Sequence, residues 1–175
     1  MRALDKRKVC IQRRSLLSNS ERLLKEKAIT NCVLPFLKGK IGIYIPIRNE
    51  VDVYSHIHNN FDLYIPKMLD DKTIAFYSDQ EEKIKGKFST IEPIGICEEK
   101  KLDVILVPVV GFFETYRMGY GKGYYDRYLK DSSALKIGLA FDVQEMVFDV
   151  KPTDIELDMI ITESRIYDEN IILWG

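Results

Sequence analysis

The sequence predicts an α/β fold with three layers, in which a mainly parallel mixed sheet carries helices on both faces. Short apolar runs rich in β-branched residues alternate with amphipathic runs, and this succession of strand, helix and strand is typical of such sheets. No internal repeat, low-complexity tract or Pro/Gly/Ser linker divides the 175 residues. We therefore expect a single domain that spans residues 1–175.

Two helices are expected before the first strand. The first helix, within residues 2–17, is basic and weakly amphipathic. Ser18 and Glu21 have the spacing of a capping box, so a second helix should run to about Val33. The second helix is expected to present a mixed face formed by Leu23, Leu24, Lys27 and Ala28.

The remaining pattern alternates strands with helices. Strands are expected at residues 41–45, 61–65, 73–77, 102–107, 136–141 and 159–162, and helices at residues 51–59 and 124–130. Pro66 is expected to stop the second strand. The apolar, β-branched stretch from Leu102 to Val107 is the clearest central strand. Because ligands bind beyond the carboxyl ends of strands in such sheets, we expect the site in the segment after Val107.

The charge balance argues against a general attraction to nucleic acid or anionic lipid. Lys and Arg number 26 and Asp and Glu 27, which gives a net charge of -1. The charges are uneven, however, because residues 1–27 hold nine basic and three acidic side chains and residues 142–175 hold two and nine. This asymmetry reflects either the chance distribution of surface charge or a site that uses both signs.

The cysteines and the apolar runs indicate a cytoplasmic protein. Cys10, Cys32 and Cys97 are odd in number, lie far apart and form no metal-binding spacing, as expected for a reduced intracellular protein. The first residues are charged and lack the apolar region of a secretory signal. No apolar run approaches the roughly 20 residues of a membrane span. We expect a monomer that acts on small molecules and uses neither nucleic acid nor a membrane.

The segment RMGYGKGYYDRYL, residues 117–129, predicts an anion-binding turn. Its three alternate glycines allow positive φ angles and a close approach to a ligand, and amides that lead into a helix attract anions. Arg117 and Lys122 suit a phosphate group. The spacing matches neither a Walker A loop nor a dinucleotide-binding GxGxxG, so a merely tight strand-to-helix turn is the alternative. Asp126 is either an ordinary acid of the first helical turn or a ligand of Mg²⁺.

The longer stretch VPVVGFFETYRMGYGKGYYDRYL, residues 107–129, resembles the signature of 5-formyltetrahydrofolate cyclo-ligases. The resemblance extends in order over most of the chain, through residues 45–52, 64–67, 91–93, 102–106 and 152–162. There are two departures. The stretch between Phe112 and Arg117 is one residue shorter than usual and has Phe113-Glu114 where the family has an Asp, and Lys122 replaces the commoner middle glycine.

The resemblance implies an ATP- and Mg²⁺-dependent enzyme that converts 5-formyltetrahydrofolate into 5,10-methenyltetrahydrofolate, with release of ADP and phosphate. Arg117 and Lys122 would act in catalysis, and Asp126 and Asp154 would hold Mg²⁺. The implied ATP-binding residues are Lys6, Arg7, Arg117, Met118, Gly119, Tyr120, Gly121, Lys122, Gly123, Tyr124 and Tyr125, so the basic helix within residues 2–17 would form part of the ATP site. The implied folate-binding residues are Ile45, Glu50, Lys67, Phe88, Tyr120, Gly121, Lys122, Gly123, Tyr124 and Tyr125.

Two other functions stay open at this point. A homologue that binds folate or nucleotide without turnover is compatible with the shortened stretch before Arg117. A nucleic-acid-binding module would use the basic residues of the first helix, although no known nucleic-acid-binding motif is present. Those basic residues are Arg2, Lys6, Arg7, Lys8, Arg13 and Arg14.

Overall fold

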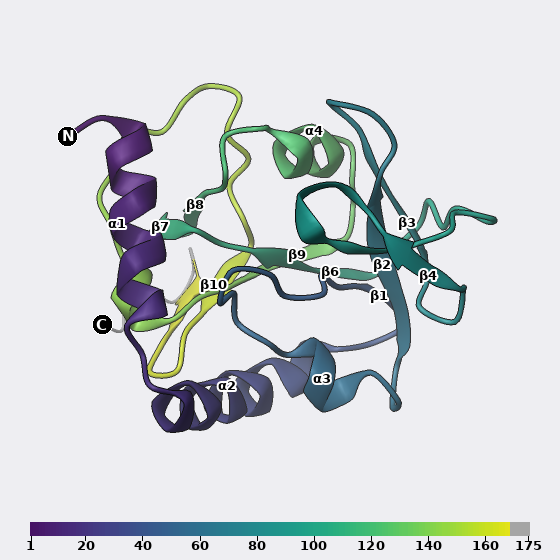
Figure 1. Cartoon of the computed structure of the whole chain (residues 1–175), viewed down its shortest axis with the longest axis horizontal. Coiled ribbons are helices and arrows are strands. Elements are labelled where there is room, and N and C mark those ends of the chain that lie inside the picture. Colours follow the sequence, from purple (N-terminus) through teal and green to yellow (C-terminus); the bar gives the residue numbers. More distant parts are fainter. Residues whose placement is uncertain (169–175) are drawn as a thin grey trace.

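The computed structural model describes residues 1–168, so residues 169–175 of the predicted domain lie outside the described part. Its centre is a seven-stranded sheet (Figure 1). The inner strands run parallel, and both edge strands are antiparallel to their neighbours. In order across the sheet the strands are β11 (Ile166–Asp168), β10 (Met159–Ile161), β9 (Leu135–Leu139), β6 (Val104–Pro108), β1 (Lys40–Gly42), β2 (Asp62–Met68) and β3 (Ile74–Ser78).

Helices cover both faces of the sheet, which confirms the predicted three layers (Figure 1). α2 (Asn19–Val33) and α3 (Tyr54–Ile57) lie on one face, and α4 (Tyr124–Lys130) lies on the other. The buried strand β6 supplies both cores, because successive side chains of a strand point to opposite faces. Val104 and Leu106 pack in the core of α2, and Ile105 and Val107 pack in the core of α4.

α1 (Ala3–Ser15) stands at one end of the molecule rather than on the sheet (Figure 1). Cys10, which is fully buried, packs with Val110 and Met118 in a small core between α1 and the segment that follows β6. The helix thereby lies beside the segment in which the sequence predicts the site. Within residues 1–168, no helix is long and apolar enough to cross a membrane.

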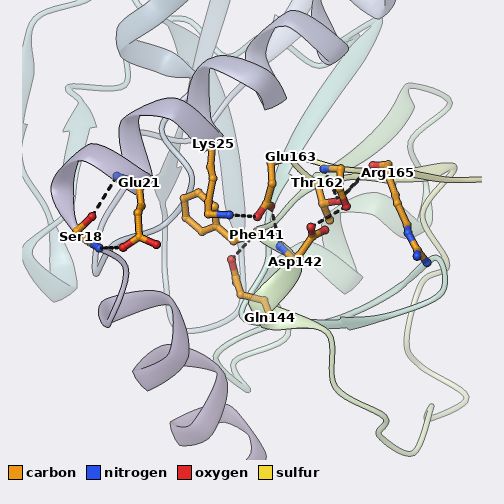
Figure 2. A network of polar contacts seen from close by, with 10 residues as sticks. Ser18, Glu21, Lys25, Phe141, Asp142, Gln144, Thr162, Glu163 and Arg165 are labelled. Carbon is orange, nitrogen blue, oxygen red and sulfur yellow. Dashed lines mark hydrogen bonds and ion pairs between the residues drawn. The ribbon is translucent and has the colours of Figure 1, made fainter.

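The capping box of α2 is confirmed, whereas the expected mixed face of that helix is wrong. The Ser18 hydroxyl accepts the Glu21 N–H, and the Glu21 carboxylate accepts the Ser18 N–H, each at 3.1 Å (Figure 2). Leu23 and Leu24 are exposed. The buried face includes two polar residues, which can be buried because they form hydrogen bonds. A pattern of apolar residues alone does not predict such a face. That face consists of Glu26, Ile29, Thr30 and Val33.

The predicted helix at residues 51–59 is shortened to the single turn of α3. Its first residues are instead held in a buried non-helical segment. The Tyr44 hydroxyl donates to the Val51 carbonyl at 2.7 Å, and the Asp52 N–H donates to the Glu26 carboxylate at 2.7 Å. The Asp52 side chain then accepts the Ser55 N–H at 2.9 Å. These tertiary contacts outweigh the local helical pattern.

Pro66 does not stop β2, which continues to Met68. The N–H of Leu69 donates to Thr73 of the β3 side, and the carbonyl of Leu63 accepts from Asp79. Odd-numbered residues of β2 therefore form the hydrogen bonds to β3, and the nitrogen of Pro66 points away from β3. A proline is tolerated there because no ladder hydrogen bond is lost on that side.

Two small hairpins were not predicted. β4 (Lys83–Lys85) pairs with β5 (Ile91–Pro93), and β7 (Gly111–Phe113) pairs with β8 (Tyr116–Met118). The second hairpin is the stretch that is one residue shorter than the family pattern. Phe113 pairs with Tyr116, so Glu114 and Thr115 alone form the turn, with Glu114 at a φ of 54°. The edge strand β11 is also additional to the prediction.

Candidate active site

A cavity of about 290 Å³ lies beyond the carboxyl ends of β1, β2 and β6, which is where the fold predicts the site. Its walls come from several segments that are distant in the sequence. Seven of the side chains predicted to contact the folate line it: Ile45, Glu50, Phe88, Tyr120, Lys122, Tyr124 and Tyr125. Arg117 lines it as well.

Glu50 places a buried carboxylate in the wall of this cavity. It is 5% exposed, and its two oxygens accept the Ile47 N–H at 2.9 Å and the Tyr120 hydroxyl at 3.2 Å. Burial raises the pKa of the Glu50 carboxyl, and the Ile47 N–H, Arg14, Tyr120 and Arg117 act against that rise. Each oxygen retains lone-pair capacity, so Glu50 is able to accept further N–H groups from a ligand.

Arg117 reaches the same cavity from β8. Its Nε donates to the Pro108 carbonyl at 2.9 Å, and its guanidinium lies 5.4 Å from the centroid of the Tyr125 ring. A Cβ on Gly119 would collide with the Arg117 Nη2, so the glycine is needed for this side-chain position. Burial lowers the pKa of Arg117, and Asp126 opposes that change most strongly. The two-residue hairpin turn is therefore compatible with an arginine delivered to the cavity.

Arg7 of α1 contacts the turn formed by residues 119–123, hereafter the glycine segment. Its Nε donates to the Gly119 carbonyl at 2.8 Å, and its guanidinium stands 3.4 Å from where a Cβ on Gly121 would lie. Gly121 has a φ of 95°, a conformation that side chains rarely adopt. Lys6 precedes Arg7 on the same helix and is half-buried. Met118 points elsewhere, because its side chain is buried in the core beneath α1.

Arg127 is the third arginine, after Arg117 and Arg7, that lies at the glycine segment, and it was not predicted as a site residue. Its Nη2 donates to the Lys122 carbonyl at 2.8 Å and its Nε to the Lys72 carbonyl at 2.7 Å. A Cβ on Gly123, whose φ is 73°, would lie 2.7 Å from its Nη1. In the sequence Arg127 is only one basic residue of a short helix. No pattern in the neighbouring residues predicts its contact with the turn after β2.

Phe88 forms part of the mouth of the cavity. It is 50% exposed and has a φ of 57°, and Ser89 beside it has a φ of 61°. Positive φ angles at successive non-glycine residues are uncommon, and backbone strain of this kind clusters at functional sites. The Lys122 ammonium lies 6.0 Å from the Phe88 ring. Lys67 lies outside the lining, with its ammonium 4.0 Å from the carboxylate of Glu92, a lining residue that was not predicted.

Comparisons with known proteins show the family of the chain. A family model described as the 5-formyltetrahydrofolate cyclo-ligase family matches residues 5–163. The chain belongs to this family. It is 35% identical over 170 residues to the 5-formyltetrahydrofolate cyclo-ligase of Mycoplasma pneumoniae, and the match covers 90% of this chain and 96% of the relative.

Two structures of cyclo-ligase relatives share the fold. A 5,10-methenyltetrahydrofolate synthetase from Mycoplasma pneumoniae matches with a TM-score of 0.75 and 32% identity, over 93% of this chain and 99% of the other. The NMR structure of the Aquifex aeolicus 5,10-methenyltetrahydrofolate synthetase matches with a TM-score of 0.80 and 33% identity, over 96% and 93%. The mostly parallel sheet with helices on both faces is thus the fold of this cyclo-ligase family.

The two carboxylates that the cyclo-ligase pattern assigns to Mg²⁺ belong to neighbouring segments. Asp126 on α4 accepts the Ile155 N–H at 3.2 Å, which brings residue 154 close to the helix. The Asp154 carboxylate accepts the Lys151 N–H at 2.7 Å. No group of three or more His, Cys, Asp or Glu side chains in residues 1–168 is arranged to hold a metal. Two carboxylates nevertheless fit Mg²⁺, which completes its coordination with waters and phosphate oxygens.

The basic residues of α1 are largely used within this cyclo-ligase chain. Arg14 is fully buried, Arg7 contacts the glycine segment, and Arg13 donates to the Glu145 carbonyl at 3.2 Å. Arg2 pairs with Asp5 at 3.1 Å. Several of the cations on which a nucleic-acid-binding module would depend therefore have partners in their own chain. Arg14 was predicted only as part of that module, and its burial among polar groups has no signature in the sequence.

Proposed function

We propose that this protein converts 5-formyltetrahydrofolate into 5,10-methenyltetrahydrofolate at the cavity, with ATP as the co-substrate and ADP and phosphate as the other products. The observation that carries the proposal is that a buried carboxylate, Glu50, and a half-buried guanidinium, Arg117, line one cavity beside the glycine segment. One cavity thus offers an acceptor for a heterocyclic ring and cations for phosphate groups.

The folate would bind with its pterin ring at Glu50. A carboxylate accepts hydrogen bonds from neighbouring N–H groups, and the pterin ring presents its amino group and a ring N–H side by side. Ile45 supplies an apolar wall and Phe88 an aromatic face at the mouth. Tyr125 also lines the cavity, with its ring beside the Arg117 guanidinium. Lys67 lies outside the lining and is paired with Glu92, so we assign it only a contact with the glutamate tail of the folate.

The phosphates of ATP would bind along the glycine segment. Arg7, Arg117 and Lys122 bring three positive charges to residues 119–123. Phosphoryl transfer depends mainly on alignment and on neutralisation of charge, and this set supplies both. The contact of Arg7 with Gly119 supports the assignment of α1 to the ATP site, and the continuous sheet supports a single-domain organisation.

The reaction needs the weakly nucleophilic formyl oxygen to attack the γ-phosphorus. The new O–P bond forms as the bond to ADP breaks, which leaves the folate with a phosphorylated imidate. The 10-nitrogen then attacks the formyl carbon and gives up its proton to solvent, the ring closes and phosphate departs with the former formyl oxygen. Arg117 and Lys122 would hold the charge of the transferred group, and Glu50 would hold the pterin ring so that the 10-nitrogen faces the formyl carbon.

Mg²⁺ would be held by Asp126 and Asp154 together with the phosphates, and it would reduce the repulsion between them. Asp126→Asn should then raise the Mg²⁺ concentration that gives half-maximal activity by about tenfold, because one charged ligand is lost. A titration of activity with Mg²⁺ measures this. Asp131→Asn, at the other end of α4, is the control and should leave the titration unchanged. An unchanged titration for Asp126→Asn would assign Asp126 to the helix alone.

An absorbance assay tests the proposal as a whole. The protein is mixed with 5-formyltetrahydrofolate, Mg²⁺ and ATP, and the near-ultraviolet absorbance of the methenyl product is followed. We expect a signal that requires both ATP and Mg²⁺. Folded protein that binds the folate without producing this signal would be a non-catalytic homologue, and folded protein that binds neither substrate would refute the proposal.

A further inference from the structure

One buried arginine joins three segments that form the candidate site. Arg14, near the end of α1, is 0% exposed. Its Nε donates to the Arg48 carbonyl at 3.0 Å, its Nη1 to the Val109 carbonyl at 3.0 Å and its Nη2 to the Tyr120 hydroxyl at 2.8 Å. The three acceptors follow β1, β6 and β8. A single guanidinium, which does not itself line the cavity, therefore joins three segments that form its wall.

The charge of Arg14 has an indirect partner. All three hydrogen bonds go to uncharged oxygens, although buried charges are normally paired. The Tyr120 hydroxyl that accepts from Arg14 lies 3.2 Å from the Glu50 carboxylate, to which it donates its own proton. A chain of two hydrogen bonds therefore links the cation on α1 to the anion in the cavity wall.

We propose that Arg14 is a positioning residue that acts through Tyr120 and through the Arg48 carbonyl to hold the Glu50 carboxylate in place, as an anion, for the folate. This inference rests on the proposed function, in which Glu50 receives the pterin ring. Arg14 itself does not line the cavity, so its effect on the ligand passes through the groups that it holds.

The groups around Glu50 make its charge state depend on Arg14. The charged groups that act on it are Arg14 from α1 and Arg117 from β8, and the titratable hydroxyls of Tyr44, Tyr120 and Tyr125 complete the surroundings. Burial raises the pKa of Glu50, and Arg14 opposes this more strongly than Arg117 does. Loss of Arg14 should therefore move protonation of Glu50 to higher pH.

Orientation is the second contribution. Arg14 holds the Arg48 carbonyl, and Arg48 has a φ of 48° in the turn that carries Glu50. The Val109 carbonyl keeps a second donor, Gln144, if Arg14 is replaced, whereas no second donor to the Arg48 carbonyl is described. The turn at residues 48–50 is consequently the part of the site that depends most on Arg14.

Binding of 5-formyltetrahydrofolate, measured by calorimetry without ATP between pH 5.5 and 8.5, tests the proposal. Arg14→Met should weaken binding at pH 7 by at least about tenfold, as expected for loss of a charge-assisted hydrogen bond. It should also move the acidic limit of binding to higher pH. Arg14→Lys, which keeps the charge but not the three bonds, should restore the acidic limit more fully than the affinity.

A double-mutant cycle tests the route through the hydroxyl. Tyr120→Phe keeps Arg14 but removes the link to Glu50. If Arg14 acts through that link, Arg14→Met combined with Tyr120→Phe should bind no more weakly than the weaker single variant. Arg13→Met is the matched control. Arg13 precedes Arg14 on α1 but donates to the Glu145 carbonyl and not to Glu50, Tyr120 or the turn at residues 48–50, so its replacement should not change the pH dependence of binding.

A ligand-free measurement separates this inference from the proposed function. Titration of the ¹³C-labelled Glu50 carboxyl by NMR should give a higher midpoint in Arg14→Met and Tyr120→Phe than in the wild type. If the wild type bound no folate but the midpoint still moved, only the proposed function would fail. An unchanged midpoint, or a loss of affinity that merely follows the loss of stability in urea, would overturn the role of Arg14. If Arg14→Met does not fold, Arg14→Lys and Tyr120→Phe decide the question.

Discussion

At the scale of single residues, the site is made by two charged groups, the buried Glu50 and the half-buried Arg117. Glu50 and Arg117 both lie where burial disfavours their charge, which raises the pKa of the first and lowers the pKa of the second. Each is compensated by fixed hydrogen bonds, from the Ile47 N–H in one case and to the Pro108 carbonyl in the other. Such prearranged charges stabilise a developing transition state more than mobile surface charges do.

Arg117→Ala should lower kcat by about a hundredfold or more, because the proposed mechanism then loses one of the charges that hold the transferred phosphoryl group. The free energy of unfolding should fall by only about 1–2 kcal/mol, since one hydrogen bond to a backbone carbonyl is lost. Steady-state kinetics and urea unfolding measure the two effects. Arg2→Ala, which removes an exposed arginine paired with Asp5, should change neither quantity. An undiminished kcat would exclude Arg117 from the mechanism.

Glu50→Gln should separate binding from stability. Because burial raises the pKa of folded Glu50, the folded state holds its proton more tightly than the unfolded chain does. This stabilisation is present below the unfolded pKa and is lost as the pH rises through the folded pKa, so ionised Glu50 weakens the fold at neutral pH. The variant should unfold at an equal or higher urea concentration at pH 7, yet bind folate about tenfold more weakly.

Wild-type folate affinity should fall as the pH drops through the pKa of Glu50, and this limb should be missing from Glu50→Gln. Binding measured over a pH series checks the expectation. If the variant kept the same acidic limb as the wild type, another group would be responsible for it.

At the scale of elements, local signals survive where tertiary contacts agree with them. The capping box of α2 and the apolar strand β6 were both predicted, because each depends only on residues that are close together in the sequence. α3 was predicted too long, since Tyr44 and Glu26 bind the backbone of residues 51–52 from distant segments. Pro66 was misread because its effect depends on which side of the strand its nitrogen faces.

The candidate site divides in the same way. The glycine segment was recognisable from its spacing and its family resemblance. Arg14 was not assigned to it, because the arginine reaches Tyr120 across 106 residues. Arg127 was not singled out either, because its contact with Lys72, in the turn after β2, spans 55 residues. Separations of this length leave no pattern in a single sequence.

Ser18→Ala should lower the free energy of unfolding by about 1 kcal/mol, because the N-terminal amide of α2 loses its side-chain acceptor. Activity should stay at the wild-type value, since Ser18 lies outside the cavity lining. Urea denaturation and the absorbance assay measure the two quantities. Ser20→Ala, two residues along the same exposed stretch, serves as the control and should cost much less, because it removes only a hydroxyl contact with Ser18. Equal effects of the two substitutions would remove the capping box as the cause.

At the scale of the whole molecule, the basic beginning and the acidic later part of the chain meet. Lys25 on α2 forms an ion pair of 2.8 Å with Glu163, whose other oxygen accepts the Asp142 N–H at 2.8 Å (Figure 2). Arg13 reaches the Glu145 carbonyl in the same region. Part of the uneven charge along the sequence is therefore a contact between segments rather than a chance distribution.

Lys25→Met should lower the free energy of unfolding at pH 7 by about 0.5–1 kcal/mol, because the pair is partly screened by solvent. The hydrogen bond to Glu163 raises the pKa of Lys25. Its contribution is thus present below the unfolded pKa of lysine and is lost as the pH rises through the folded pKa. The difference from the wild type, measured in urea, should shrink in strong alkali. Lys27→Met, an exposed neighbour, should show no such difference at either pH.

The contacts of α1 also bear on the order in which a growing chain can fold. α1 is synthesised before its partners Val109, Tyr120 and Glu145, which follow about a hundred residues later. Contacts so distant in sequence are closed slowly, and synthesis at roughly 5–20 residues per second delays them further. The basic helix α1 therefore stays exposed until the segments that follow β6 have been synthesised. A chain truncated before those segments would lack the partners that bury α1.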